Sequence, residues 1–235
     1  MPKHAVVSEE KWLAARREHL AAEKEFTRAR DRLSEARRAL PWVKVGKAYS
    51  FDGPEGKINL AYLFEGRSQL IVYHFMFAPD WNEGCKSCSF WMDNFDGVTS
   101  HLNQRDVSLV AVSRAPLEKL DAFKRRMGWN FNWVSSGDSD FNYDFRVSFT
   151  DAEKAKNEIA YNYGMRPYFS SDGPGLSVFH KDETGALFHT YSCYSRGLDM
   201  LNTAYNLLDL VPKGRNEGGL PYGMAWVKLH DKYDL

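Results

Sequence analysis

The sequence has few cysteines, no net charge and no long apolar run, and each of these features excludes a class of protein. Only three cysteines occur in 235 residues, so the chain lacks the disulfide framework of small secreted domains. Its 31 basic and 31 acidic residues cancel, which gives no whole-chain attraction to nucleic acid or to anionic membranes. No segment approaches the roughly 18 consecutive apolar residues of a membrane helix.

The first ten residues are polar and lack the apolar core of a secretory signal. We therefore expect a cytoplasmic protein that binds neither nucleic acid nor membrane. The composition, 43% hydrophobic and 26% charged, is sufficient for a sizeable hydrophobic core.

Residues 8–40 are expected to form a helix, because apolar side chains recur at spacings of three, four and seven residues. Pro41 ends this pattern. We assign residues 1–41 to an N-terminal helical arm with a narrow apolar stripe. Such a stripe favours a homodimer, although a kink near Phe26 that returns the helix to its own domain is the competing arrangement.

The most informative short feature is the motif Cys85-Lys86-Ser87-Cys88, which follows the apolar, strand-like run 69–77. Two thiols on one turn can close a disulfide and reopen it by exchange. The N-terminus of the helix that follows would lower the pKa of Cys85. Lys86 either stabilises the thiolate further or is an ordinary solvated side chain.

Two other interpretations of the cysteine pair remain open. A structural zinc site would need about two more Cys or His ligands at suitable spacing, and Cys193 stands alone far along the chain. The other interpretation is two inert thiols. We expect no metal and no cofactor, and we interpret Cys193 as a small buried residue.

After residue 42, strand-like and helix-like segments alternate. Expected strands at 69–77, 107–113 and 131–135 are separated by helices at 88–105 and 116–127, which predicts parallel βαβ units. A leading hairpin (49–64), a late strand pair (176–180 and 186–191) and a helix (197–210) complete a thioredoxin-type layout. The predicted domain is 42–211, and residues 212–235 form a C-terminal tail packed on it.

Several motifs resemble one bacterial family, labelled DUF899, which is described as thioredoxin-like and as predicted dithiol-disulfide oxidoreductases. They are Leu70–Phe77, Ala78–Trp81, Gly84–Phe95, Val110–Pro116, Met127–Trp129, Ser139–Asp144 and Tyr194–Asp199. The resemblance implies an α/β fold, a thioredoxin-like three-layer sandwich with a central mixed sheet. It covers nearly all of residues 10–235.

Comparison with the wider thioredoxin superfamily implies that Cys85 is the nucleophile and that Cys88 resolves the mixed disulfide. The chain departs from thioredoxins proper, because Gly84 stands where they have Trp and Lys86-Ser87 replaces Gly-Pro. The Pro-x-x-x-Thr-x-x-Cys pattern of peroxiredoxins is absent, so peroxide reduction by that mechanism is not supported.

The same comparison implies supporting roles for two residues. Thioredoxin-like sites have a cis-proline facing the disulfide, and Pro174 is the candidate, unless it is an ordinary turn proline between two glycines. His74 lies near the position of their buried acid and would relay the proton of the second thiol, unless it is a core histidine.

Other residues have a structural and a functional interpretation. Trp81 would shield the disulfide and Asp80 would cap or orient the loop before it, although each is more often structural. The aromatic middle of the chain would line a hydrophobic cleft, form core or form a subunit interface. It comprises Trp129, Phe131, Trp133, Tyr161, Tyr163, Tyr168 and Phe169.

The leading hypothesis is a cytosolic dithiol-disulfide oxidoreductase, whose partners are a disulfide substrate and a dithiol reductant. The rival is a non-catalytic thioredoxin-like protein that binds a ligand or partner and whose cysteines only sense oxidation.

Overall fold

The structure, a computed structural model, describes residues 4–168 and 170–234; residues 1–3 of the arm, Phe169 and Leu235 lie outside the described residues. The chain divides into two compact units, residues 1–41 and 42–235. The first contains helix α1 (Glu9–Arg38), which begins where the Ser8 hydroxyl accepts a hydrogen bond from the Lys11 N–H. The helix continues through Phe26, and none of its residues is buried.

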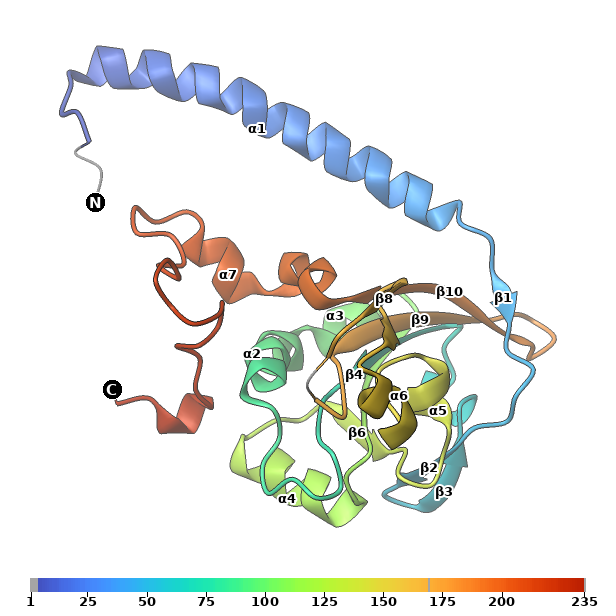
Figure 1. Ribbon diagram of the computed structural model, residues 1–235. Helices are drawn as coiled ribbons and strands as arrows, with labels where there is room; N and C mark the ends of the chain where they lie inside the picture. Colours follow the sequence, from blue (N-terminus) through green and yellow to red (C-terminus); the bar gives the residue numbers. More distant parts are fainter. Residues whose placement is uncertain (1–3, 169, 235) are drawn as a thin grey trace. The chain divides into compact units, whose positions relative to one another are not determined.

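An eight-stranded mixed sheet organises the second unit (Figure 1), in the order β1-β10-β9-β4-β5-β6-β2-β3. Strands β4, β5 and β6 are parallel to one another, whereas β9 runs antiparallel to β4 and β10 runs antiparallel to β9. A separate hairpin joins β7 to β8. The strands are β1 (Val43–Lys44), β2 (Ser50–Gly53), β3 (Gly56–Asn59), β4 (Gln69–His74), β5 (Val107–Ser113), β6 (Asn132–Ser135), β7 (Ile159–Tyr161), β8 (Gly164–Arg166), β9 (Gly175–Lys181) and β10 (Leu187–Tyr194).

Short helices connect and flank these strands (Figure 1). The α-helices are α2 (Lys86–Phe95), α3 (Thr99–Asn103), α4 (Leu117–Arg126), α5 (Phe141–Asp144), α6 (Asp151–Lys156) and α7 (Thr203–Leu208). The 3-10 helices are η1 (Tyr62–Phe64), η2 (Asp96–Val98), η3 (Ser195–Leu201) and η4 (His230–Lys232).

Two hydrophobic clusters lie on opposite faces of the sheet, because successive side chains of a strand alternate between faces. Tyr73 belongs to the cluster that α2 and α4 cover, which includes Cys88 and Phe123. Val72 belongs to the other cluster, together with Phe141 of α5. The central strands β4 and β5 are buried on both faces of the sheet, which explains their nearly continuous apolar sequence.

The topology confirms the expected fold. The unit β4–α2–β5 is a parallel crossover, and the antiparallel pair β9–β10 lies on the other side of β4 and is followed by α7. This arrangement is the thioredoxin fold, a three-layer α/β sandwich with a central mixed sheet. The N-terminal helix is present as expected.

One predicted helix is wrong in extent. The expected helix 197–210 is the 3-10 helix η3 followed by α7, and the two are separated at Asn202. The backbone of Asn202 is extended, and its side chain accepts a hydrogen bond of 3.0 Å from the Tyr205 N–H, which starts a new helix. The segment 88–105, expected to be mostly helical, is so, because α2, η2 and α3 follow one another without a gap.

The C-terminal segment after α7 contacts the rest of the second unit. Leu229 is buried in the cluster that contains Cys88. Arg126 of α4 donates a hydrogen bond of 2.7 Å to Asp231, and Lys232 lies 2.8 Å from Glu83.

Candidate functional site

The backbone around Cys85 is fixed at the junction between β4 and α2. Cys85 occupies the N-cap position of α2, and its N–H donates a hydrogen bond of 3.1 Å to the Met76 carbonyl. Gly84 is buried between two rings; a Cβ there would lie 2.8 Å from Phe75 and 2.9 Å from Phe123. Glycine is therefore required just before the first cysteine, at the position where thioredoxins have tryptophan.

Cys88 lies one turn further along α2 and faces the protein interior. Its side chain is 1% exposed, whereas Cys85 is half-buried. The Met76 N–H donates a hydrogen bond of 3.4 Å to the Cys88 sulfur. The helix itself is fixed further along, because the Trp91 indole donates a hydrogen bond of 2.8 Å to the Leu198 carbonyl.

The two thiols differ strongly in acidity. A hydrogen bond from the Cys88 thiol lowers the pKa of Cys85 to about 7 against the opposing effect of burial, and hydrogen bonds from Ser87 and from the Cys88 backbone contribute. Burial and the adjacent Cys85 raise the pKa of Cys88 well above its usual value. At neutral pH the pair can therefore hold one thiolate, on Cys85, and one proton, on Cys88.

A cavity of about 220 Å³ opens in front of the pair. Its walls come from β4, α2, β7, β8 and the segments before β9 and after β10. The lining residues used below are Tyr73, Cys85, Cys88, Tyr161, Arg166, Tyr168, Pro174, Arg196 and Asp199.

Tyr73 presents its hydroxyl to the Cys88 sulfur at this cavity. The side chain is fully buried, and its hydroxyl has no oxygen or nitrogen partner in the part of the chain that the structure describes. Burial raises the pKa of Tyr73 well above its usual value, and the neighbouring Cys88 adds to the shift. The hydrogen bond from Tyr73 acts in the opposite direction on Cys88, whose pKa it lowers, so the hydroxyl favours a thiolate on that residue.

Tyr161 ties the hairpin β7–β8 to the segment before β9. Its hydroxyl donates a hydrogen bond of 2.6 Å to the Pro174 carbonyl and accepts one of 3.2 Å from the Ser195 N–H. Ser195 has a φ of 51°, a left-handed backbone conformation that points its N–H at this hydroxyl. The three residues form one wall of the cavity.

Pro174 faces the thiols, as expected from the thioredoxin comparison, but its peptide bond is trans, since no cis peptide bond occurs among the described residues. The segment is held by other contacts. Asp172 forms a buried ion pair of 2.8 Å with Arg114 and accepts a hydrogen bond of 2.7 Å from Ser148. The Gly173 N–H donates to the Val147 carbonyl at 2.9 Å.

His74 lies on the other face of the sheet from the cysteines. Its Nε2 is 2.8 Å from the Ser177 hydroxyl, and its ring stacks on Phe145 at 5.9 Å. Burial lowers the pKa of His74 to about 3, with a smaller effect from His189, so the ring is neutral. We therefore do not assign it the proton relay that the thioredoxin comparison implies; Tyr73, the preceding residue, points to the thiols instead.

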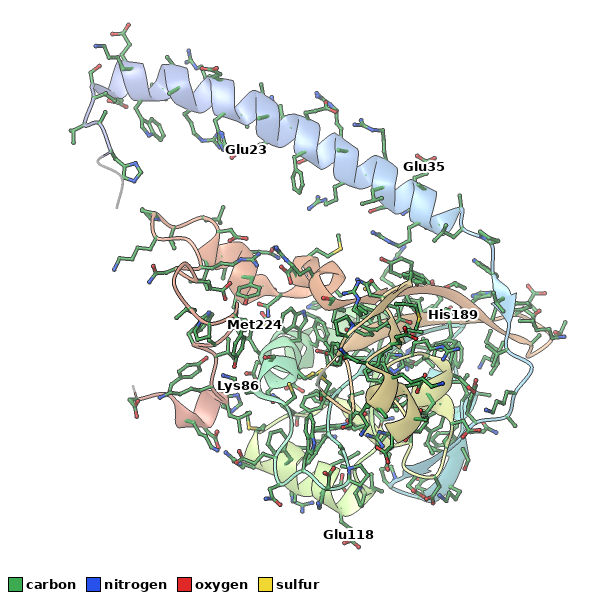
Figure 2. All side chains as sticks on the ribbon, viewed as in Figure 1. Glu23, Glu35, Lys86, Glu118, His189 and Met224 are labelled. Carbon is green, nitrogen blue, oxygen red and sulfur yellow. The ribbon has the colours of Figure 1, made fainter. Side chains whose placement is uncertain are left out.

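The Lys86 side chain extends toward the C-terminal segment (Figure 2). Its ammonium group donates a hydrogen bond of 3.2 Å to the Ala225 carbonyl and lies 5.9 Å from the Tyr222 ring centre. It is not among the groups that lower the pKa of Cys85. The helix N-terminus and Cys88 thus carry the effect that the sequence suggested for this lysine.

The other sequence candidates lie outside the cavity. Asp80 is exposed, and the carbonyl of half-buried Trp81 accepts a hydrogen bond of 3.1 Å from Lys119. Neither residue lines the cavity. Cys193 is 8% exposed within the cluster that also contains Cys88.

Two arginines that sequence reasoning missed lie among the lining residues. Arg166 is exposed and its guanidinium stands 5.8 Å from the Tyr161 ring centre. Arg196 is 87% exposed and lies 3.2 Å from Asp199, which also pairs with Arg215 at 3.1 Å. No local motif marks these arginines, because the topology brings them to the site from distant parts of the chain.

Among residues 4–168 and 170–234, no group of three His, Cys, Asp or Glu side chains is arranged to hold a metal ion. Within the same residues, no helix is both long enough and apolar enough to span a membrane.

The fold and the site define a thioredoxin-fold protein with a Cys-x-x-Cys pair at the start of the helix that follows the central strand. The chain belongs to the family of bacterial proteins of unknown function DUF899, whose family model matches residues 1–233. No curated protein matches it.

Solved structures that resemble the chain include several peroxiredoxins. A cysteine-to-serine mutant of Xanthomonas campestris peroxiredoxin Q is 14% identical, with a TM-score of 0.44 over 67% of this chain and 90% of that one. The peroxidoxin BcpB from Mycobacterium tuberculosis is 12% identical, with a TM-score of 0.46 over 70% and 94%. The mitochondrial 2-Cys peroxiredoxin from Plasmodium falciparum is 12% identical, with a TM-score of 0.41 over 72% and 92%.

Proposed function

We propose that the protein is a dithiol-disulfide oxidoreductase that acts through Cys85 and Cys88. One observation carries the proposal: a half-buried thiol with a pKa lowered to about 7 stands at the cavity, and a buried thiol of raised pKa donates to it from behind. Stepwise thiol–disulfide exchange requires this difference in pKa, because one sulfur attacks as a thiolate while the other stays protonated until the second step.

In the first step, the Cys85 thiolate attacks one sulfur of a substrate disulfide. A bond forms between Cys85 and that sulfur, the substrate S–S bond breaks, and the other substrate half leaves as a thiolate that takes a proton from water. In the second step, Cys88 attacks the Cys85 sulfur, and the proton of Cys88 passes to the departing substrate sulfur. The second substrate half leaves as a thiol, and the protein retains a Cys85–Cys88 disulfide.

Each turnover thus moves two electrons from the protein to the substrate. A dithiol reductant, present as a second substrate, restores the two thiols by the reverse exchange. We place this cycle in the cytoplasm, where dithiol reductants keep such pairs reduced.

Neighbouring groups support the second step. Once Cys85 is joined to the substrate it carries no charge, so the contribution of the Cys85 charge to the raised pKa of Cys88 disappears, and burial remains. The Met76 N–H already points at the Cys88 sulfur from 3.4 Å and would stabilise the thiolate as it forms. The Tyr73 hydroxyl is a second donor beside the same sulfur.

The test measures turnover of a model disulfide by a catalytic amount of the protein, with excess dithiothreitol as reductant. The rate of the uncatalysed reaction is subtracted. We expect Cys85→Ser to abolish turnover, and Cys193→Ala to retain it as a matched control in the same cluster. Full activity of Cys85→Ser would overturn the proposal.

The alternative is a non-catalytic thioredoxin-like protein that binds a ligand in the same cavity, with cysteines that only respond to oxidation. This alternative predicts that the wild-type protein forms the Cys85–Cys88 disulfide with an oxidant such as diamide but gives no turnover above background.

A further inference from the structure

We propose that the cavity beside Cys85 selects a low-molecular-weight disulfide that carries a carboxylate, rather than a disulfide within a protein. This inference rests on the proposed oxidoreductase activity and specifies its substrate class. Three independent features of the site lead to it: the backbone beside the thiols, the small size of the cavity and the charges among its lining residues.

The backbone beside the thiols is already occupied. An extended peptide binds along such a segment by pairing with free N–H and C=O groups. In the segment before β9, the Gly173 N–H donates to Val147 at 2.9 Å and the Pro174 carbonyl accepts from Tyr161 at 2.6 Å. Proline has no N–H of its own. A peptide substrate would find no free N–H at Gly173 or Pro174, and it would share the Pro174 carbonyl with Tyr161.

The cavity is small and bounded by aromatic rings. Its volume of about 220 Å³ is below the roughly 300–1,000 Å³ of sites for drug-sized ligands. Tyr161 and Tyr168 stand on the side of the β7–β8 hairpin, and Tyr73 lies on the side of the sheet. This space suits one short half of a small disulfide, whose apolar carbons would contact the rings.

The charge among the lining residues favours an anion. Of the carboxylates near the cavity, Asp199 is already paired with Arg196 at 3.2 Å and Arg215 at 3.1 Å. Arg166 has no carboxylate partner within the described residues, and its guanidinium lies against the Tyr161 ring. A guanidinium is suited to bidentate binding of a carboxylate. The substrate half therefore has its sulfur at Cys85, a short apolar body along the tyrosines and a carboxylate at the arginines.

The covalent steps are the same as those of the proposed oxidoreductase cycle. Cys85 forms a bond to the sulfur of the half that lies in the cavity, the substrate S–S bond breaks, and the outer half leaves as a thiolate that water protonates. Cys88 then displaces the bound half as a thiol, and a dithiol reductant restores the pair.

The experiment compares three disulfides of matched length: 3,3′-dithiodipropionate, 2-hydroxyethyl disulfide and cystamine, which are anionic, neutral and cationic. Each kcat/KM is divided by the rate of the same disulfide with a small thiol, which removes intrinsic reactivity. We expect the normalised kcat/KM to be highest for the anionic disulfide, intermediate for the neutral one and lowest for the cationic one. We expect insulin, a protein disulfide substrate, to be slower than the anionic compound.

Substitutions of the two lining arginines then test whether they cause the preference for the anionic disulfide. Arg166→Gln and Arg196→Gln should each reduce kcat/KM for the anionic compound about three- to fivefold relative to kcat/KM for the neutral compound, mainly through KM. Arg105→Gln is the matched control, because Arg105 is exposed at the opposite end of the parallel strands.

The outcomes separate the two proposals. Equal normalised rates for the three compounds, or insulin faster than all of them, would overturn the inference while the oxidoreductase activity stands. No turnover of any disulfide would overturn the proposed function itself.

Discussion

The hydroxyl of Tyr161 donates a hydrogen bond of 2.6 Å to the carbonyl of Pro174, and this contact joins two distant segments in front of the cysteine pair. Tyr161 comes from β7, and Pro174 immediately precedes β9. Gly173, the residue before Pro174, packs against the Tyr161 ring, because a Cβ at this position would lie 2.8 Å from that ring. Glycine at this position is therefore what allows the tyrosine to reach the proline carbonyl.

Gly173→Ala should displace the Tyr161 ring and open the cavity wall. We expect the free energy of unfolding to fall by about 1–3 kcal/mol, the usual range for overpacking a buried site, and turnover to fall with it. Chemical denaturation and the disulfide turnover assay measure the two effects. Gly164→Ala is the control, because no atom lies within 4 Å of its added Cβ; equal losses in the two variants would refute this explanation.

Tyr73→Phe should separate stability from chemistry. The hydroxyl has no oxygen or nitrogen partner among the described residues and only the weak hydrogen bond to the Cys88 sulfur, so its removal should change the free energy of unfolding by less than about 1 kcal/mol. If the hydroxyl donates to Cys88 as that thiolate forms, its loss should slow the second step about ten- to a hundredfold, the range for a hydrogen bond to a charged group.

Rapid mixing with a chromogenic disulfide follows both steps for Tyr73→Phe, as release of the first and then the second substrate half. Tyr168→Phe, in the same cavity, is the control. A stable variant with an unchanged second step would exclude this role for the hydroxyl.

The reactivity of Cys85 should titrate near neutral pH. Because its pKa is lowered to about 7 from an ordinary 9.0, its thiolate and its alkylation rate should rise through pH 7 and level off above it. Iodoacetamide labelling, read by mass spectrometry on the Cys85 peptide, gives this profile without interference from Cys193.

Cys88→Ala tests the cause of that shift. The largest contribution to the lowered pKa is the hydrogen bond from the Cys88 thiol, so its removal should move the midpoint toward the ordinary value. A wild-type midpoint near 8.5 or above, or a midpoint that Cys88→Ala leaves unchanged, would contradict the electrostatic account of the pair.

The apolar stripe of α1 supports a proposal of a homodimer. Leu20 is 37% exposed and Leu33 is 57% exposed, and twofold association is the commonest way for a protein to bury such a surface. We expect a dimer by light scattering, and we expect Leu20→Glu/Leu33→Glu to weaken it. Arg17→Glu/Arg30→Glu, on the same exposed helix, controls for added negative charge. A monomeric wild-type protein would refute the proposal.

The sequence was sufficient to predict the central fold, because its signals are local. The apolar runs that became β4 and β5 and the cysteine pair between them predict a parallel crossover with two thiols at its turn. The break at Asn202 was missed, because a single capping side chain in an otherwise helical pattern is a weak signal.

The site beyond the cysteines could be predicted only in part. In a strand buried on both faces, a continuous apolar pattern does not show which face a residue takes, so His74 rather than Tyr73 was assigned to the thiols. The sequence also shows an aromatic middle of the chain, but it does not show which of these aromatic residues line the cavity and which lie in the core. Tyr161 and Tyr168 line the cavity, whereas Trp129 and Trp133 belong to the core.

The central claim is that Cys85 attacks a disulfide and Cys88 resolves the product, and trapping the intermediate tests it most directly. Cys88→Ala treated with 3,3′-dithiodipropionate or 2-hydroxyethyl disulfide should accumulate one mixed disulfide on Cys85, identified by intact mass and peptide mapping. The wild-type protein should instead lose two hydrogens and end with a Cys85–Cys88 bond. No adduct on Cys88→Ala, or an equal adduct on Cys85→Ala, would contradict the account.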